Sequence, residues 1–227
     1  MFKLFLIATL TALILYANEY KNTPIMNNLN LNKQLLIVSK SGDHQGIQRL
    51  LKKGANINAT DKRGRTPLMI ATYNNDFETS KILISAGADV NILDNLKNNP
   101  FLYAGAEGYI NILKLTIEAG ADASLLNRYG GTALIPASEH GYVEVVKLLL
   151  EKTDTDVNLI NNLGWTALLE AIILNYGGVN QQETIKLLIK HGADVNINDG
   201  QGVSPLEHAR QRGFREIERI LIKAGGK

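Results

Sequence analysis

The chain has 227 residues, of which 45% are apolar and 20% charged, and its 24 basic and 22 acidic residues give a formal net charge of +2. This composition is typical of a folded globular protein, and such a balance of charges gives no basic patch of the kind that binds nucleic acid. The chain contains no cysteine, which excludes disulfides, thiolate metal sites, cysteine nucleophiles and a lipidated N-terminal cysteine.

The first 17 residues follow the pattern of a secretory signal peptide. Lys3 supplies a positive charge, Leu4–Ala17 contains nothing more polar than threonine, and a polar segment follows. As a helix this run would span about 21 Å, short of the ~30 Å hydrocarbon core of a bilayer. We therefore expect cleavage after Ala17 and export to the periplasm, with no membrane contact afterwards. Because Leu15 is less typical than alanine three positions before the cut, an uncleaved anchor is the alternative.

Beyond the signal, the sequence is organised by a repeat. Residues 18–30 are rich in Asn and contain Pro24, so we expect a flexible lead-in there. Gly54, Gly87 and Gly120 then each open a similar turn at intervals of 33 residues. A fixed period of this length predicts a solenoid.

A second landmark keeps the same period and predicts where helices begin. It is a Thr, Ser or Asn followed by Pro or Ala and an apolar residue. The first side chain caps the free N–H groups of a helix, and proline suits the next position. This landmark occurs at residues 66–68, 99–101, 132–134, 166–168 and 204–206.

This pattern resembles the ankyrin repeat, in which two antiparallel helices are followed by a projecting β-turn loop. The resemblance implies an all-α solenoid over residues 31–227, with about six repeats including two caps. We place the repeats at 31–60, 61–93, 94–126, 127–160, 161–198 and 199–227. Apolar residues at helical spacing mark the second helix of each repeat and are expected to form the core.

The chain departs from the repeat at four places. Residues 153–158 replace the Gly-Ala-Asp turn with one extra residue, so this turn should deviate locally. The fifth repeat is lengthened in residues 174–182, between its two helices, which is the best hint of a special surface. Pro136 lies about four residues after the expected cap Thr132, where a proline begins to cost a helix hydrogen bond. The histidine that usually follows Thr-Pro-Leu is replaced, with apolar packing expected in its place, by Met69, Leu102, Ile135, Leu169 and Glu207.

Two runs, Gly-Gly-Thr-Ala-Leu-Ile-Pro-Ala at 130–137 and Gly-Trp-Thr-Ala-Leu-Leu-Glu-Ala at 164–171, carry a narrower resemblance. They are similar to a bacterial group of exported ankyrin proteins with a lengthened fifth repeat, sometimes encoded beside catalases. The resemblance implies an accessory role, such as chaperoning an exported catalase or delivering its haem. A carrier of haem or another small molecule is a further alternative, which would need an enclosed pocket.

The expected binding surface is the concave face, which in ankyrin stacks is formed by the loop tips and the exposed side of the first helices. On repeats four and five this mapping brings large aromatic side chains together, and such residues often dominate interfaces. For Trp165 the alternative is that it packs between neighbouring loops. The same mapping puts Tyr73, Leu96 and Glu107 on the concave face of earlier repeats. The predicted partner-binding residues are Arg128, Tyr129, Glu139, His140, Leu163, Trp165, Ile173 and Tyr176.

Nothing in the sequence predicts catalysis or a cofactor. The four histidines are solitary, with none at the i, i+4 spacing of a helical metal site, and no phosphate loop or nucleophile motif occurs. Glu170 is assigned no catalytic role. The recurrent Asp and Asn residues at 61, 94, 127, 161 and 199 share one repeat position, which favours turn formation over acid chemistry. We therefore predict a monomeric, non-catalytic protein-binding module that needs no metal or cofactor.

Overall fold

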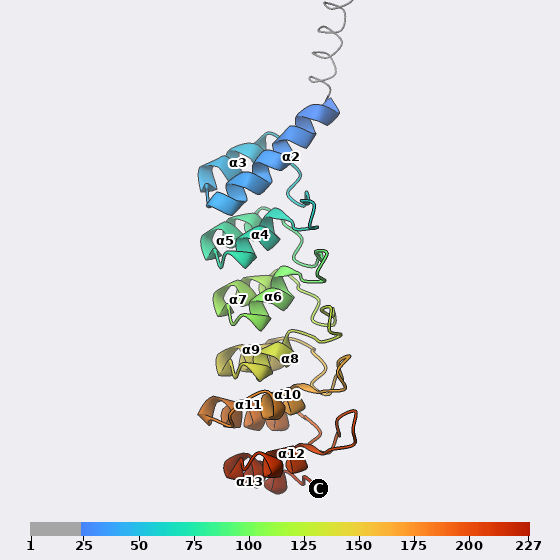
Figure 1. Ribbon diagram of the computed structural model, residues 1–227. Coiled ribbons are helices and arrows are strands. Elements are labelled where there is room, and N and C mark those ends of the chain that lie inside the picture. The colour runs from blue at the N-terminus through green and yellow to red at the C-terminus, as the bar shows by residue number, and fades with distance from the viewer. Residues whose placement is uncertain (1–23) are drawn as a thin grey trace, which may run out of the picture.

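The computed structural model describes residues 24–227, with side chains from residue 30 on. Within that part of the chain it consists of helix pairs stacked along one axis, with the connecting loops projecting on one side (Figure 1). We call the first helix of each pair, which lies beside the loops, the inner helix, and the second the outer helix. The inner helices are α2 (Pro24–Ser41), α4 (Pro67–Tyr73), α6 (Pro100–Ala106), α8 (Leu134–Glu139), α10 (Ala167–Ile173) and α12 (Pro205–Gln211). The outer helices are α3 (His44–Lys52), α5 (Phe77–Ser85), α7 (Ile110–Glu118), α9 (Val143–Lys152), α11 (Val179–Lys190) and α13 (Arg215–Lys223).

These pairs confirm the predicted all-helical solenoid of six repeats. The expected lead-in at residues 18–30 is corrected in part, because α2 already begins at Pro24. Proline suits the first position of a helix, since its φ is preset and an N–H there would have no partner within the helix. The predicted signal peptide lies outside the described residues. Within those residues, no helix has both the length and the apolar character needed to cross a membrane.

The predicted caps form at four of the five inner helices that follow a loop. The hydroxyl of Thr66 accepts a hydrogen bond of 3.1 Å from the N–H of Met69, and the side chain of Asn99 accepts one of 2.7 Å from Leu102. Thr166 and Ser204 cap α10 and α12 in the same way. Each cap satisfies an N–H group that the first helical turn leaves free.

The prediction that Thr132 caps its helix is wrong. The helix α8 begins two residues later, at Leu134, with no side-chain cap, and Thr132 lies 3.3 Å from the hydroxyl of Thr155 instead. The delayed start puts Pro136 in the first turn of α8, where its missing N–H costs no helix hydrogen bond. Proline is tolerated here because the helix is shortened.

The core runs through the stack between inner and outer helices. Apolar residues of the outer helices, such as Leu83, Leu113 and Leu149, are fully buried. The position usually held by histidine is buried and apolar in four repeats, as expected: Met69, Leu102, Ile135 and Leu169 are between 0% and 3% exposed. The fold is therefore stabilised by burial of apolar surface between adjacent repeats.

Asparagine side chains link neighbouring repeats on the loop side. The Oδ1 atom of Asn91 accepts a hydrogen bond of 2.8 Å from the N–H of Asp122, and its Nδ2 donates one of 3.2 Å to the carbonyl of Gly120. Asn158 and Asn196 make the same pair of bonds to the repeat that follows each of them. Repeat three has Ser124 at this position, and no such bond joins it to repeat four.

The fourth turn deviates, as its sequence predicts. The other outer helices end at glycines with positive φ, such as Gly87 at 90°. After α9 the chain instead leaves through Thr153 in an extended conformation, and its hydroxyl donates a hydrogen bond of 2.7 Å to the carbonyl of Leu149. Repeats three and four thus differ from the rest of the stack on both sides of their junction.

The insertion in repeat five is divided between a loop and an extra helical turn. The helix α11 has 12 residues, against nine in α5 and α7, and Leu174–Gly178 forms the connection before it. Asn175 is tied to the carbonyl of Glu139 in the preceding repeat, and its own carbonyl accepts a hydrogen bond of 3.2 Å from Arg212 in the next. The connection is therefore fixed to both neighbouring repeats.

Candidate partner-binding groove

A groove of about 520 Å³ runs along the concave side of repeats two to five. We call it the concave groove. Its floor comes from the inner helices and its rim from the loop tips. A second hollow of about 540 Å³ beside Arg63 and Asp94 shares Tyr73 and Leu96 with it, so the two adjoin. The concave groove is lined by Tyr73, Leu96, Asn98, Tyr103, Ala106, Glu107, Asn127, Arg128, Tyr129, Gly131, Ile135, Pro136, Glu139, His140, Asn161, Leu163, Glu170 and Leu174.

The loop tips on the rim are shaped by the recurrent Asp and Asn residues. In each tip the Oδ1 atom accepts hydrogen bonds from the backbone N–H groups two and four residues later; for Asn127 these are Tyr129 at 2.8 Å and Gly131 at 3.1 Å. The prediction that these residues form turns is confirmed. Between the two bonds, Gly130 adopts a φ of 73°, where a Cβ would also lie 2.5 Å from the side chain of Asn162 in the next tip. Glycine thus avoids both a strained backbone and displacement of the Asn162 side chain where the tips of repeats four and five meet.

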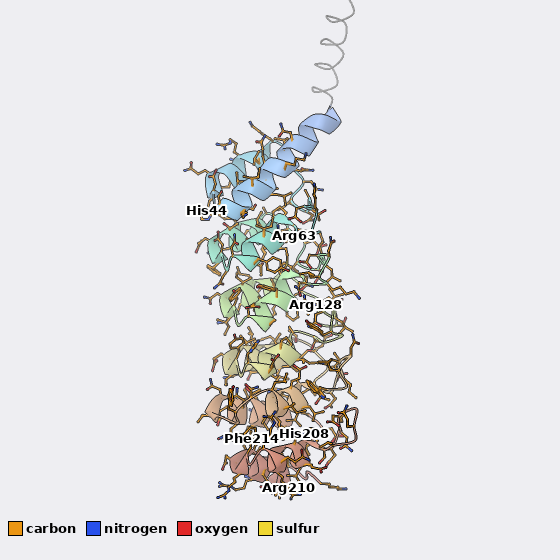
Figure 2. All side chains as sticks on the ribbon, viewed as in Figure 1. His44, Arg63, Arg128, His208, Arg210 and Phe214 are labelled. Carbon is orange, nitrogen blue, oxygen red and sulfur yellow. The ribbon has the colours of Figure 1, made fainter. Side chains whose placement is uncertain are left out.

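Arg128 and Tyr129 present a cationic and aromatic surface at the rim. Tyr129 is 50% exposed, and the guanidinium carbon of Arg128 lies 4.7 Å from the centre of its ring. Figure 2 shows Arg128 and Arg63 on the side of the stack where the loops project. On the neighbouring tips, Leu96 is 51% and Leu163 is 54% exposed. The rim therefore carries apolar side chains at the positions where an incoming chain would meet them.

The concave groove contains five of the eight predicted partner-binding residues: Arg128, Tyr129, Glu139, His140 and Leu163. Trp165 is half-buried and does not line it, and its backbone N–H and carbonyl both bond to Asn161. It occupies the same place in its tip as Arg65 and Asn98, which are half-buried too, so the repeat position could have predicted its partial burial, although Asn98 does line the groove. Ile173 lies outside the groove, and Tyr176, on the insertion, is 97% exposed away from it.

Two tyrosines, from repeats two and three, form part of the groove floor. The rings of Tyr73 and Tyr103 meet edge to face with their centres 4.4 Å apart. The hydroxyl of Tyr73 donates a hydrogen bond of 2.6 Å to Oδ2 of Asp94. Burial and this bond raise the pKa of Tyr73 to about 12, so it stays a donor at neutral pH. Periodicity did not point to Tyr103, because the equivalent positions in the two neighbouring repeats hold the apolar residues Ile70 and Pro136.

Glu170 is the most unusual side chain in the groove. It is only 5% exposed, and its Oε1 atom accepts a hydrogen bond of 2.7 Å from Nδ2 of Asn161. Burial, reinforced by the negative charge of Glu139, raises the pKa of Glu170 to about 7. A carboxylate with this pKa is partly ionised at neutral pH. The charge of Glu170 on the groove floor therefore changes with pH and with the charges placed near it.

The same repeat position is filled differently in the last repeat. There Nε2 of His208 lies 2.7 Å from Oδ2 of Asp199. Burial acts to raise the pKa of Asp199, but backbone N–H bonds from Val203 and Gln201 and the contact with His208 outweigh it and lower the pKa. Within residues 24–227, no three His, Cys, Asp or Glu side chains are grouped so that they could hold a metal ion.

The arrangement defines a class of protein: a helical repeat solenoid with a binding groove on its concave, loop-bearing side. A family model described as ankyrin repeats (3 copies) matches residues 8–94, 35–127, 101–199 and 154–227. The chain therefore belongs to the ankyrin-repeat family. Ankyrin repeats are in general protein-binding modules.

Similar proteins agree with this assignment. The ankyrin repeat protein YahD of Escherichia coli (strain K12) is 53% identical over 77 residues, which are 34% of this chain and 38% of that protein. The human protein phosphatase 1 regulatory subunit 27 is 38% identical over 66 residues, or 29% of this chain and 40% of its own. The chain thus matches less than half the length of these curated relatives.

Solved structures match over more of the chain. The crystal structure of an ankyrin repeat domain from Acinetobacter baumannii AYE is 51% identical, with a TM-score of 0.83, and the match covers 85% of this chain and 98% of that one. The ankyrin repeat domain of Bcl-3, a member of the IκB protein family, is 26% identical with a TM-score of 0.75, covering 86% of each chain. The stacking of the repeats is therefore shared with solved ankyrin domains.

Proposed function

We propose that this chain is a non-catalytic, exported protein-binding module that holds its partner in the concave groove, centred on repeats four and five. The observation that carries the proposal is the row of half-exposed apolar side chains along one rim, Leu96, Tyr129 and Leu163, above a floor of tyrosines and carboxylates. Large apolar side chains set among polar groups are typical of protein interfaces. Membership of a family of protein-binding modules supports the same reading.

The binding test removes the rim without touching the core. Partners are captured from an extract of the source organism with the wild-type chain and with a Tyr129→Ala, Leu163→Ala double variant. Ile222→Ala serves as the matched control, because Ile222 is 50% exposed but lies on α13, outside the groove. We expect the wild type and the control to retain the same partner and the folded double variant to lose it. Full capture by a folded double variant would place the binding surface elsewhere.

Export is tested separately. The proposal rests on the apolar run Leu4–Ala17 after Lys3, which follows signal-peptide grammar. We expect a chain recovered from the periplasm to begin at Asn18 in N-terminal sequencing, with a monomer mass in light scattering. Recovery from the cytoplasm with an intact Met1 would contradict export, and recovery from membranes with an intact N-terminus would indicate an anchor.

A further inference from the structure

Three acidic side chains lie along the floor of the concave groove. Glu107, Glu139 and Glu170 come from three consecutive repeats and all line it. Glu107 is the C-terminal cap of α6 and Glu139 the last residue of α8, so both add negative charge where the helix backbone is already partially negative. That placement does not favour helix stability. The positive groups lining the same groove are the Arg128 guanidinium and, when protonated, His140.

Within the part of the chain that the structure describes, none of these three carboxylates has a cationic partner. The ion pairs within residues 30–227 all involve other acidic side chains, and Arg128 lies against Tyr129. Glu170 is the most deeply buried of the three carboxylates. The residue is 95% buried at the groove floor, and within residues 30–227 its side chain accepts one hydrogen bond, from Asn161 to Oε1. Oε2 has no partner in that part of the chain and keeps some contact with solvent in the groove. A buried carboxylate is costly unless a cation or further donors satisfy it.

The tyrosine rings beside the carboxylates also suit a cation. Tyr73, Tyr103 and Tyr129 line the groove together with Glu170. The face of a tyrosine ring attracts ammonium and guanidinium groups. Tyr129 already holds one such group, since the Arg128 guanidinium lies 4.7 Å from its ring centre. Carboxylates and aromatic faces around one hollow together favour a positively charged guest.

We propose that the acidic floor of the concave groove is a pocket for an arginine or lysine side chain of an extended, basic segment of the protein partner, which pairs with Glu170 and Glu139. The proposal rests on the proposed binding function and names the chemistry of its partner. The apolar rim at Tyr129 and Leu163 contacts the flanking residues of the segment. An acidic segment is repelled by the same carboxylates.

The test uses a random linear peptide library displayed on phage as the probe, panned against the full mature chain. We expect the wild type to enrich peptides with one fixed Arg or Lys beside apolar residues. The Glu139→Gln, Glu170→Gln variant should lose the preference for the basic residue while keeping the apolar one. Glu151→Gln, an exposed carboxylate on α9 outside the groove, is the matched control and should select the same peptides as the wild type.

The selected peptide is then synthesised with Arg or Lys and with Gln at the fixed position, and its affinity is measured by calorimetry. Losing either the basic residue or Glu170 should weaken binding by about tenfold or more, and losing both should add little beyond that. Glu139→Gln alone, at a half-exposed position, repeats the comparison if the Glu170 variant is unstable. Enriched peptides without a basic residue would overturn this inference and leave the binding module standing, whereas no enrichment at all would overturn both.

Discussion

The side-chain amide of Asn161 donates a hydrogen bond of 2.7 Å to Oε1 of Glu170, nine residues further along the chain. The last repeat has the same geometry with the roles exchanged, since Oδ2 of Asp199 lies 2.7 Å from the ring nitrogen of His208, also nine residues on. The residue that forms the loop tip is therefore matched to the side chain it meets on the inner helix: an amide to a carboxylate, and a carboxylate to an imidazole.

This matching predicts a compensating pair of substitutions. Asn161→Asp alone should lower the free energy of unfolding by about 2 kcal/mol, because it removes a buried donor and sets two carboxylates together. Adding Glu170→His should recover most of the loss by recreating the pair of the last repeat. Urea denaturation at pH 7 measures both changes. Asn127→Asp is the control, since Pro136 occupies the matching position; a double variant no more stable than Asn161→Asp would contradict the idea.

Glu170 also makes stability depend on pH. Burial and the charge of Glu139 raise its pKa from 4.5 to about 7, so between these values the unfolded chain loses the proton first. The stabilising contribution of protonated Glu170 to the free energy of unfolding is thus fully present below pH 4.5 and is lost as pH rises through 7. We expect Glu170→Gln to be more stable than the wild type by on the order of 3 kcal/mol at pH 8 and by much less at pH 5. Equal differences at both pH values in denaturant titrations would refute this; Glu151→Gln controls for loss of one charge.

Lys97 offers a stabilising substitution. Its φ of 57° is in the left-handed region, at the tip position where Gly64, Gly130 and Gly164 stand in other repeats. In that conformation a residue with a side chain is less stable than glycine by about 1 kcal/mol. Part of this advantage of glycine is lost because glycine gives up more conformational entropy when the chain folds. Lys97→Gly should raise the free energy of unfolding by about 0.5 kcal/mol and increase Tm. Lys62→Gly, in a tip whose glycine is already in place, should not; a lower Tm for Lys97→Gly would count against the argument.

The asparagine links between repeats can be tested by introducing the serine that repeat three has, as Ser124, at the equivalent position. Asn91→Ser removes the bonds to Asp122 and Gly120 that join repeats two and three. We expect a loss of about 1–2 kcal/mol and faster amide hydrogen exchange at that junction. Ser85→Ala, which changes an exposed residue of α5, is the control. Unchanged exchange at Asp122 in Asn91→Ser would show that the link contributes nothing.

Periodicity was sufficient to predict the repeats, most of the caps and the turn-forming Asp and Asn residues, because each is repeated and has a local physical cause. It failed at Thr132, where the neighbouring turn is irregular and the hydroxyl finds Thr155 instead. It also gave no role to Glu170, since the repeat position it occupies changes character along the stack. The residues at that position are Ile70, Tyr103, Pro136, Glu170 and His208. Which of them face a groove depends on side chains from three repeats at once, and no single repeat encodes that.

The missing link at Ser124 lies at the junction of repeats three and four, and residues from both of these repeats line the concave groove. Asparagine links join repeats one to three, beginning with Asn58 to the N–H of Asp89, and likewise repeats four to six. No such link joins repeats three and four on the loop side. A small change of curvature at the junction of repeats three and four would move Leu96 relative to Leu163 without breaking the asparagine links on either side. We expect the width of the groove to adjust to its occupant by bending at this junction, because the buried core that spans repeats three and four holds the helices together there.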